Sequence, residues 1–113
     1  MESNIVIAAL SALAQESRLA IFRMLVTEGQ PGLAAGEIAQ RLQIPAATLS
    51  FHLSQLRHAG LIESRREERS IIYSANFSSM MNLIAYLTEN CCGGMGSCAT
   101  SCDPTPKPKR RKS

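Results

Sequence analysis

The chain has 113 residues, no tryptophan, 4% aromatic residues and a formal net charge of +3. Its length suits one small domain, and so few aromatic side chains argue against a base-stacking platform or a large aromatic ligand site. Five of the 12 basic residues lie between positions 107 and 112, so that seven remain against nine acidic residues. The rest of the chain is therefore slightly acidic, which excludes a broadly basic nucleic-acid-binding body.

The first half of the chain predicts three helices. Ile5–Leu13 is apolar almost all round, which is typical of a helix buried on several sides and suggests a subunit interface. Gln15–Thr27 is amphipathic, and the break at Gly29–Gly32 separates it from a short helix over Ala35–Leu42. The apolar face predicted for the second helix consists of Leu19, Phe22, Leu25 and Val26.

The second half predicts a longer helix, a hairpin and a last helix. Ala46–Ala59 carries leucines at positions 49, 53 and 56 as a narrow buried stripe, and Gly60 is placed to cap its end. Alternating residues predict strands over Ile62–Arg66 and Ser70–Ala75. Asn76 is placed to cap a helix from Phe77 to about Asn90, after which Gly93, Gly94 and Gly96 are expected to end helical order.

Two short helices, a tight turn and a two-stranded ribbon predict a winged helix-turn-helix, a mainly α fold with a β-hairpin wing. The helix over Ala46–Ala59 has the size to enter a DNA major groove. The candidates for contacts to bases or phosphates on this helix are Thr48, Ser50, Phe51, His52 and Gln55. On the hairpin, Arg65, Arg66 and Arg69 are candidates for contacts to phosphates or a minor groove. The alternative is a generic packing unit, in which Phe51 packs on a neighbouring helix and the charged hairpin is only a solvated surface.

Three segments, Ser17–Leu25, Thr48–Ile62 and Arg65–Tyr73, resemble the ArsR/SmtB family of metalloregulatory repressors. The resemblance runs from about residue 5 to residue 90. It implies a homodimer built on the first and last helices, which represses transcription by binding an imperfect inverted repeat in double-stranded operator DNA. It also implies DNA contacts by Thr48, Ser50, Phe51 and His52, together with the arginines of the wing.

All four cysteines lie between positions 91 and 102. Because the chain shows neither a signal peptide nor an 18-residue apolar span, we expect a cytoplasmic protein with no membrane partner. Thiols stay reduced in that compartment, so the cluster favours metal, metalloid or redox chemistry over structural disulfides. We expect a DNA-binding and dimerisation domain over 1–90, a cysteine-rich inducer-binding segment over 91–102 and a basic tail over 103–113.

The other sensor positions of the family carry no suitable ligand in this sequence. The helix over Ala35–Leu42 has no cysteine and Phe77–Asn90 has no histidine. The spacing of Cys91, Cys92 and Cys98 resembles an arsenic-responsive subgroup with a C-terminal three-cysteine site, which implies As(III) or Sb(III) as the inducer. Three thiolates suit a thiophilic metalloid.

Several alternatives remain for the cysteines. Cys102 is a possible fourth ligand, and four thiolates would suit Zn(II) or Cd(II) better. The segment could also sense Hg or an organoarsenical such as methylarsenite, or act as a thiol redox switch. Two alternatives without sensing are an inert tail and a structural zinc module. No organic cofactor is predicted. We expect no enzymatic activity, because the sequence shows neither a nucleophile–base pair nor a glycine-rich phosphate loop.

Overall fold

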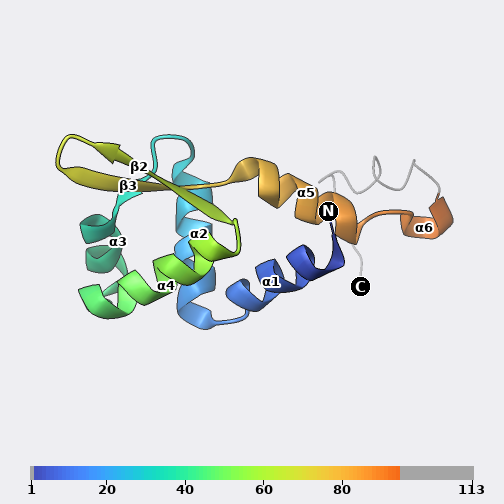
Figure 1. Cartoon of the computed structure of the whole chain (residues 1–113), viewed down its shortest axis with the longest axis horizontal. Helices are drawn as coiled ribbons and strands as arrows, with labels where there is room; N and C mark the ends of the chain where they lie inside the picture. Colours follow the sequence, from blue (N-terminus) through green and yellow to red (C-terminus); the bar gives the residue numbers. More distant parts are fainter. Residues whose placement is uncertain (1, 95–113) are drawn as a thin grey trace, which may run out of the picture. The chain divides into compact units, whose positions relative to one another are not determined.

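The computed structural model describes residues 2–94, which form six helices and three strands (Figure 1). The elements are α1 (Ser3–Leu13), α2 (Glu16–Glu28), β1 (Leu33–Ala34), α3 (Ala35–Leu42), α4 (Ala46–His58), β2 (Ile62–Glu67), β3 (Ser70–Ala75), α5 (Phe77–Leu87) and α6 (Cys91–Gly94). The fold class predicted from the sequence, mainly α with a hairpin wing, is confirmed. The described residues fall into two units that divide after Leu83, and the hydrophobic core lies in the first.

Helix α1 buries only part of its apolar surface within one chain. Val6, Ala9 and Ala12 are buried, whereas Ile5 and Ile7 are 46% and 60% exposed. The predicted helix is therefore confirmed, and it presents an apolar face that the first unit does not cover.

Among residues 2–94, no single helix is long and apolar enough to cross a membrane; α1 and α2 meet that criterion only as a pair bent by 101°.

Helix α2 lies in the core through a stripe that differs slightly from the predicted one. Leu25 and Phe22 of the predicted face are 0% and 7% exposed, and Ile21, which was not assigned to that face, is also fully buried. Leu19, which the pattern placed on the same face, is 43% exposed. The prediction for Leu19 was wrong because the buried residues Ile21, Phe22 and Leu25 form a stripe centred on Leu25. Leu19 lies about 120° from Leu25 around the helix.

The turn between α3 and α4 is built from residues that stop one helix and start the next. Gln43 ends α3 in a left-handed conformation with φ of 55°, and Pro45 is the N-cap of α4, where its missing N–H costs nothing. The predicted stripe of Leu49, Leu53 and Leu56 is buried in the core. The backbone at Gly60 has a φ of 77°, which favours glycine directly after the helix.

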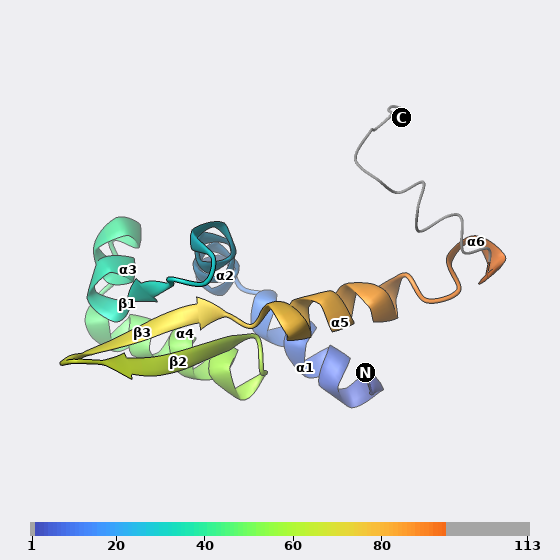
Figure 2. The ribbon, with the colours of Figure 1, turned by 90° about the horizontal axis from the view of Figure 1, so that it is seen from above.

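The sheet has three antiparallel strands in the order β1-β3-β2. Strand β1 was not predicted, because two residues are too few to show an alternating pattern. It pairs Leu33 with Tyr73, while β2 and β3 form the hairpin in which Glu67 pairs with Ser70. Figures 1 and 2 show the tip of this hairpin pointing away from α1. Both strands of the wing contact the helices: β3 packs against α2 and α3, and β2 packs against α4.

Helix α5 begins as predicted but ends earlier. Asn76 accepts a hydrogen bond from the Ser79 backbone N–H at 3.1 Å, which confirms its capping role. The helix ends at Leu87 and not at about Asn90; residues 88–90 form a turn, and Asn90 adopts a left-handed φ of 59°. The short helix α6 was not predicted, because its glycines favour the end of helical order.

Candidate nucleic-acid interface

The outward face of α4 carries four of the five side chains predicted to contact DNA from this helix. Thr48, Ser50, Phe51 and Gln55 are all exposed, and Phe51 has 57% of its surface accessible. An exposed aromatic ring on a helix of this size can make an apolar contact, for instance with a thymine methyl group in the major groove. This face therefore has small residues that permit close approach, one apolar contact group and several hydrogen-bonding groups.

His52 differs from its predicted role. It is 7% exposed, and its Nδ1 atom lies 3.5 Å from a terminal guanidinium nitrogen of Arg18. Burial, and then the positive charge of Arg18, lower the pKa of His52 below its usual value of 6.5. The ring faces the interior because positions 49, 52 and 56 lie on the same side of a helix, so His52 is not part of the exposed face.

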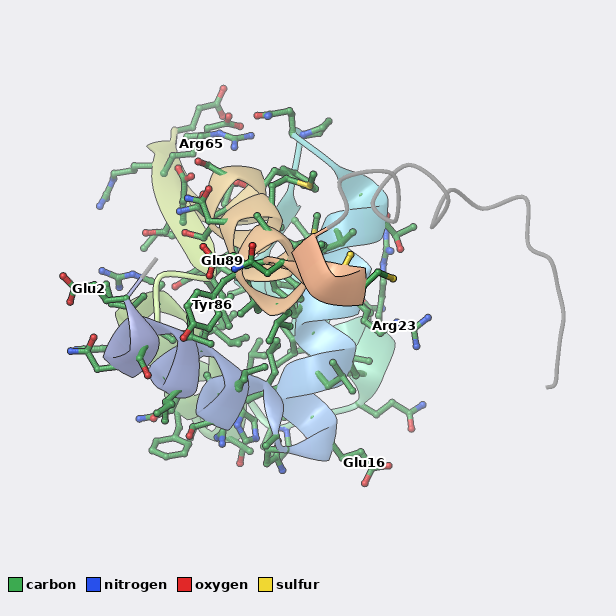
Figure 3. All side chains as sticks on the ribbon, turned by 90° about the vertical axis from the view of Figure 1, so that its right-hand side faces the viewer. Glu2, Glu16, Arg23, Arg65, Tyr86 and Glu89 are labelled. Atoms are coloured by element: carbon green, nitrogen blue, oxygen red, sulfur yellow. The ribbon has the colours of Figure 1, made fainter. Side chains whose placement is uncertain are left out.

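The wing arginines differ from one another in their surroundings. Arg65 donates through Nε to a Glu67 carboxylate oxygen at 2.7 Å, and through its terminal nitrogens to the carbonyls of Gln30 and Pro31 at 3.3 and 2.8 Å. Figure 3 labels Arg65 at this hairpin. These bonds occupy the guanidinium of Arg65 and attach the wing to the loop between α2 and β1. The sequence did not reveal this role.

Arg66 and Arg69 lie on the same hairpin and are exposed, and within residues 2–94 neither makes an ion pair or a side-chain hydrogen bond. They are therefore available to neutralise phosphates. Arg57, which sequence reasoning did not single out, is also exposed on α4 without an ion pair among the described residues. Its position in the last turn of α4 is the sequence feature that could have identified Arg57 as a candidate.

The cysteine segment is described only in part. Cys91 begins α6 and has a half-buried free thiol, and Cys92 beside it is exposed. Cys98 and Cys102 lie outside the described residues, so the predicted three-thiol site stays a prediction. Within residues 2–94, no group of three or more His, Cys, Asp or Glu side chains is close enough to hold a metal ion.

The chain matches a family model described as a helix-turn-helix domain over residues 13–65. It is 36% identical over 85 residues to the HTH-type transcriptional regulator YgaV of Escherichia coli K12, an alignment that covers 75% of this chain and 84% of the relative. The family match over residues 13–65 contains α2 to α4 and the first residues of β2, and so includes the exposed face of α4 but not Arg66 or Arg69.

Two solved structures share the fold. The transcriptional repressor BigR from Xylella fastidiosa is 32% identical with a TM-score of 0.61, covering 80% of this chain and 89% of that chain. Mb0332 from Mycobacterium bovis is described as a homodimeric winged helix-turn-helix DNA-binding domain and a possible ArsR-family regulator. It is 27% identical with a TM-score of 0.61, covering 77% of this chain and 81% of that chain.

Proposed function

Because the chain belongs to the helix-turn-helix transcriptional regulators of the ArsR/SmtB type, we propose that it is a cytoplasmic, arsenic-responsive repressor. In this proposal a homodimer binds operator DNA, and As(III) or Sb(III) bound by Cys91, Cys92 and Cys98 releases it. The observation that carries the DNA-binding part is the exposed face of α4, where Phe51 is 57% exposed beside polar side chains of the same helix. A family that includes homodimeric relatives supports the dimer.

The uncovered apolar face of α1 also supports a dimer. Ile5, Ile7 and Leu10 are each more than 40% exposed in one chain, although a chain of this size has little apolar surface to spare. A second copy that covers this face would remove these side chains from water. In a dimer the two copies of α4 are held at one fixed separation, which an inverted repeat in the operator matches.

The donor set supports a thiophilic inducer. Cys91 and Cys92 are adjacent, and Cys91 follows the last residue of α5 by four positions. In the reduced protein, these two neighbouring cysteines would supply two of the three sulfur ligands that trivalent arsenic takes. Soft ligands without histidine or carboxylate favour such a metalloid. Ligation of these cysteines acts on the chain directly after α5 and, in this proposal, weakens DNA binding. Linkage then requires that DNA binding weakens inducer binding by the same factor.

Arsenite release from DNA tests the proposal. The probe is a duplex that the reduced wild-type chain selects from a random library, and binding is followed by fluorescence anisotropy. We expect arsenite to release the wild-type chain, but not the Cys91→Ser, Cys92→Ser or Cys98→Ser variants. Cys102→Ser is the matched control, and it should respond as the wild type does. Release of all three variants by arsenite would overturn the assignment of the ligands.

Further arms of the same experiment separate the alternatives. Release by Cd(II), Zn(II) or Hg(II) but not by arsenite, with loss of the response in Cys102→Ser, would indicate a four-thiolate metal sensor. Release by methylarsenite alone would indicate an organoarsenical sensor. Release by peroxide that a reductant reverses would indicate a thiol redox switch. Circular dichroism with and without a chelator tests a structural zinc module, which predicts unfolding on chelation.

A further inference from the structure

Arg18 joins three helices of the first unit. It lies in the first turn of α2, where its backbone N–H donates to the Gln15 side chain at 2.9 Å. Its Nε atom donates to the carbonyl of Ala12 in the last turn of α1 at 2.7 Å. A terminal nitrogen of the same guanidinium lies 3.5 Å from Nδ1 of His52 in α4. One side chain therefore contacts the end of α1 and the inner side of α4 at the same time.

The contact to α1 has an electrostatic reason. The last carbonyls of a helix have no partner within it, and the C-terminal end of a helix carries a partial negative charge. Helix α1 has no basic residue in its last turn, and its C-cap residue is Ala14. Arg18 supplies the missing cation and satisfies the Ala12 carbonyl, which fixes the guanidinium at the end of α1.

The contact to α4 involves an unusual interior residue. The other buried side chains of α4 are Leu49, Leu53 and Leu56, and His52 is the buried polar side chain of the core among residues 2–94. A fourth leucine would fill the same side of the helix without a directional contact. The arginine–histidine contact instead depends on how far α4 is rotated about its axis, because the ring must point at the guanidinium.

His52 is the chain neighbour of the exposed aromatic residue on the outer face. The rings of Phe51 and His52 meet edge to face, with centroids 5.8 Å apart and planes at 60°. Phe51 points into solvent while His52 points at Arg18. Any rotation of α4 that moves His52 relative to Arg18 also moves the side chains of the outer face.

We infer that Arg18 is a positioning residue for DNA binding, which sets the rotation of α4 by holding His52 against the end of α1. The inference rests on the proposed function, in which the outer face of α4 reads the operator. Arg18 acts through His52 and touches no base or phosphate. It also links α1, whose apolar face we assign to the dimer, to the helix that reads the DNA.

The surroundings of Arg18 permit a variant that still folds. A cavity of about 330 Å³, open to solvent, lies where Arg18 meets α1 and α4. It is lined by Arg18, Gln55 and His58, with small residues of α1. Water can therefore solvate a shorter polar side chain at position 18. Arg23 provides the matched control: it lies on α2, projects outward in Figure 3, and makes no ion pair among the described residues.

The test compares Arg18→Gln, Arg18→Lys, His52→Leu and Arg23→Gln with the wild-type chain. Thermal unfolding gives their stability, and fluorescence anisotropy on the duplex selected by the wild type gives their affinity over a range of KCl concentrations. We expect Arg18→Gln and His52→Leu to bind about tenfold more weakly while folded. Arg23→Gln should bind as the wild type does. The double variant Arg18→Gln/His52→Leu should lose no more affinity than either single variant.

The lysine variant separates positioning from simple stabilisation. A lysine keeps a cation near the Ala12 carbonyl but lacks the planar fork that reaches two acceptors. We therefore expect Arg18→Lys to recover stability without recovering affinity. Recovery of both would overturn the inference, because a cation at the end of α1 would then suffice.

Two further results would also overturn it. Wild-type affinity in folded Arg18→Gln would show that Arg18 serves stability alone. A fall of about 0.9 in the slope of log K against log[salt] would show that Arg18 contacts a phosphate directly. A wild-type chain that selects no duplex at all would overturn the proposed function as well, so the two failures are distinguishable.

Discussion

The two neighbouring arginines of the wing should have separable effects on DNA binding. Arg65 holds the hairpin through Glu67 and the carbonyls of Gln30 and Pro31, whereas Arg66 makes no such bonds among residues 2–94. Both are exposed arginines on strand β2, so truncation of either to alanine removes a similar side chain. We expect Arg65→Ala to weaken binding by loosening the wing, and Arg66→Ala to weaken it by removing a cation that neutralises a phosphate.

The structure gives the size of the Arg65 effect. Its ion pair with Glu67 is exposed, with 41% and 54% of the two side chains accessible. Such a pair contributes roughly 0.2–1 kcal/mol, and each hydrogen bond to a backbone carbonyl about 0.5–1.5 kcal/mol before its exposure is taken into account. A total of about 1–2 kcal/mol corresponds to binding about five- to thirtyfold weaker. The loosened hairpin still brings Arg66 and Arg69 to the DNA, so the number of neutralised phosphates stays the same.

Salt dependence distinguishes the two effects. Affinities for the selected duplex are measured by anisotropy from low to moderate KCl, and log K is plotted against log[salt]. Arg66→Ala should reduce the slope by about 0.9 for each phosphate that the variant no longer neutralises, whereas Arg65→Ala should lower the line without changing its slope. If Arg65→Ala reduces the slope as much as Arg66→Ala does, Arg65 contacts DNA directly and its role as a wing anchor is wrong.

Three other substitutions test the site and the fold. Phe51→Ala should weaken DNA binding in anisotropy by up to about 1.5–3 kcal/mol, the free energy of burying such an apolar side chain. Thermal stability should change little because the ring is exposed, and a large fall in melting temperature would show instead that the ring supports the core. Gly32→Ala should destabilise the wing, seen as faster amide exchange in β3, because a Cβ there would clash with the Tyr73 carbonyl oxygen at a φ of 67°; unchanged exchange would contradict this. His52→Leu should make the stability less sensitive to acid. Because folding lowers the pKa of His52, the neutral ring's contribution to stability is fully present above about pH 6.5 and is lost as the pH falls from there through the folded-state pKa. The leucine variant has no such group to protonate. Denaturant unfolding across the range from neutral to mildly acidic pH measures the loss, and an equal loss in both proteins would show that other groups cause it.

Local signals in the sequence located most elements of the first unit. Helix α3 and strand β3 have the predicted bounds, because a glycine–proline break and a charged turn separate clear periodic segments. Strand β1 escaped prediction because it is defined only by its pairing with β3, which joins Leu33 to Tyr73 far along the chain. The exposure of Leu19 likewise depends on which side of α2 the other helices cover.

The site residues show the same limit at the level of single side chains. Position 52 shares the inward side of α4 with positions 49 and 56, so the spacing alone could have placed His52 inside. The polar character of histidine argued for the surface, and its partner Arg18 lies 34 positions away. For Arg65, strand alternation predicts which side of the hairpin it occupies, but not that two backbone carbonyls lie within its reach.

The pattern of bound and available arginines determines how this chain can recognise DNA. Residues 2–94 contain no lysine, and three of their seven arginines are engaged internally: Arg18, Arg41 and Arg65. Arg41 bridges Glu28 and Glu37, and these two carboxylates raise its pKa above the usual value. The described part of the chain therefore has few cations left for phosphates.

A small number of available cations implies a shallow salt dependence from the described residues and a weak contribution from sequence-independent attraction. In the proposed repressor, selectivity for an operator then comes from contacts at base edges, which the outer face of α4 is placed to make among the described residues. Such contacts depend on the rotation of α4 more steeply than charge–charge attraction does. A DNA-binding domain with few available charges thus has a physical reason to fix that rotation from within, at His52 and Arg18.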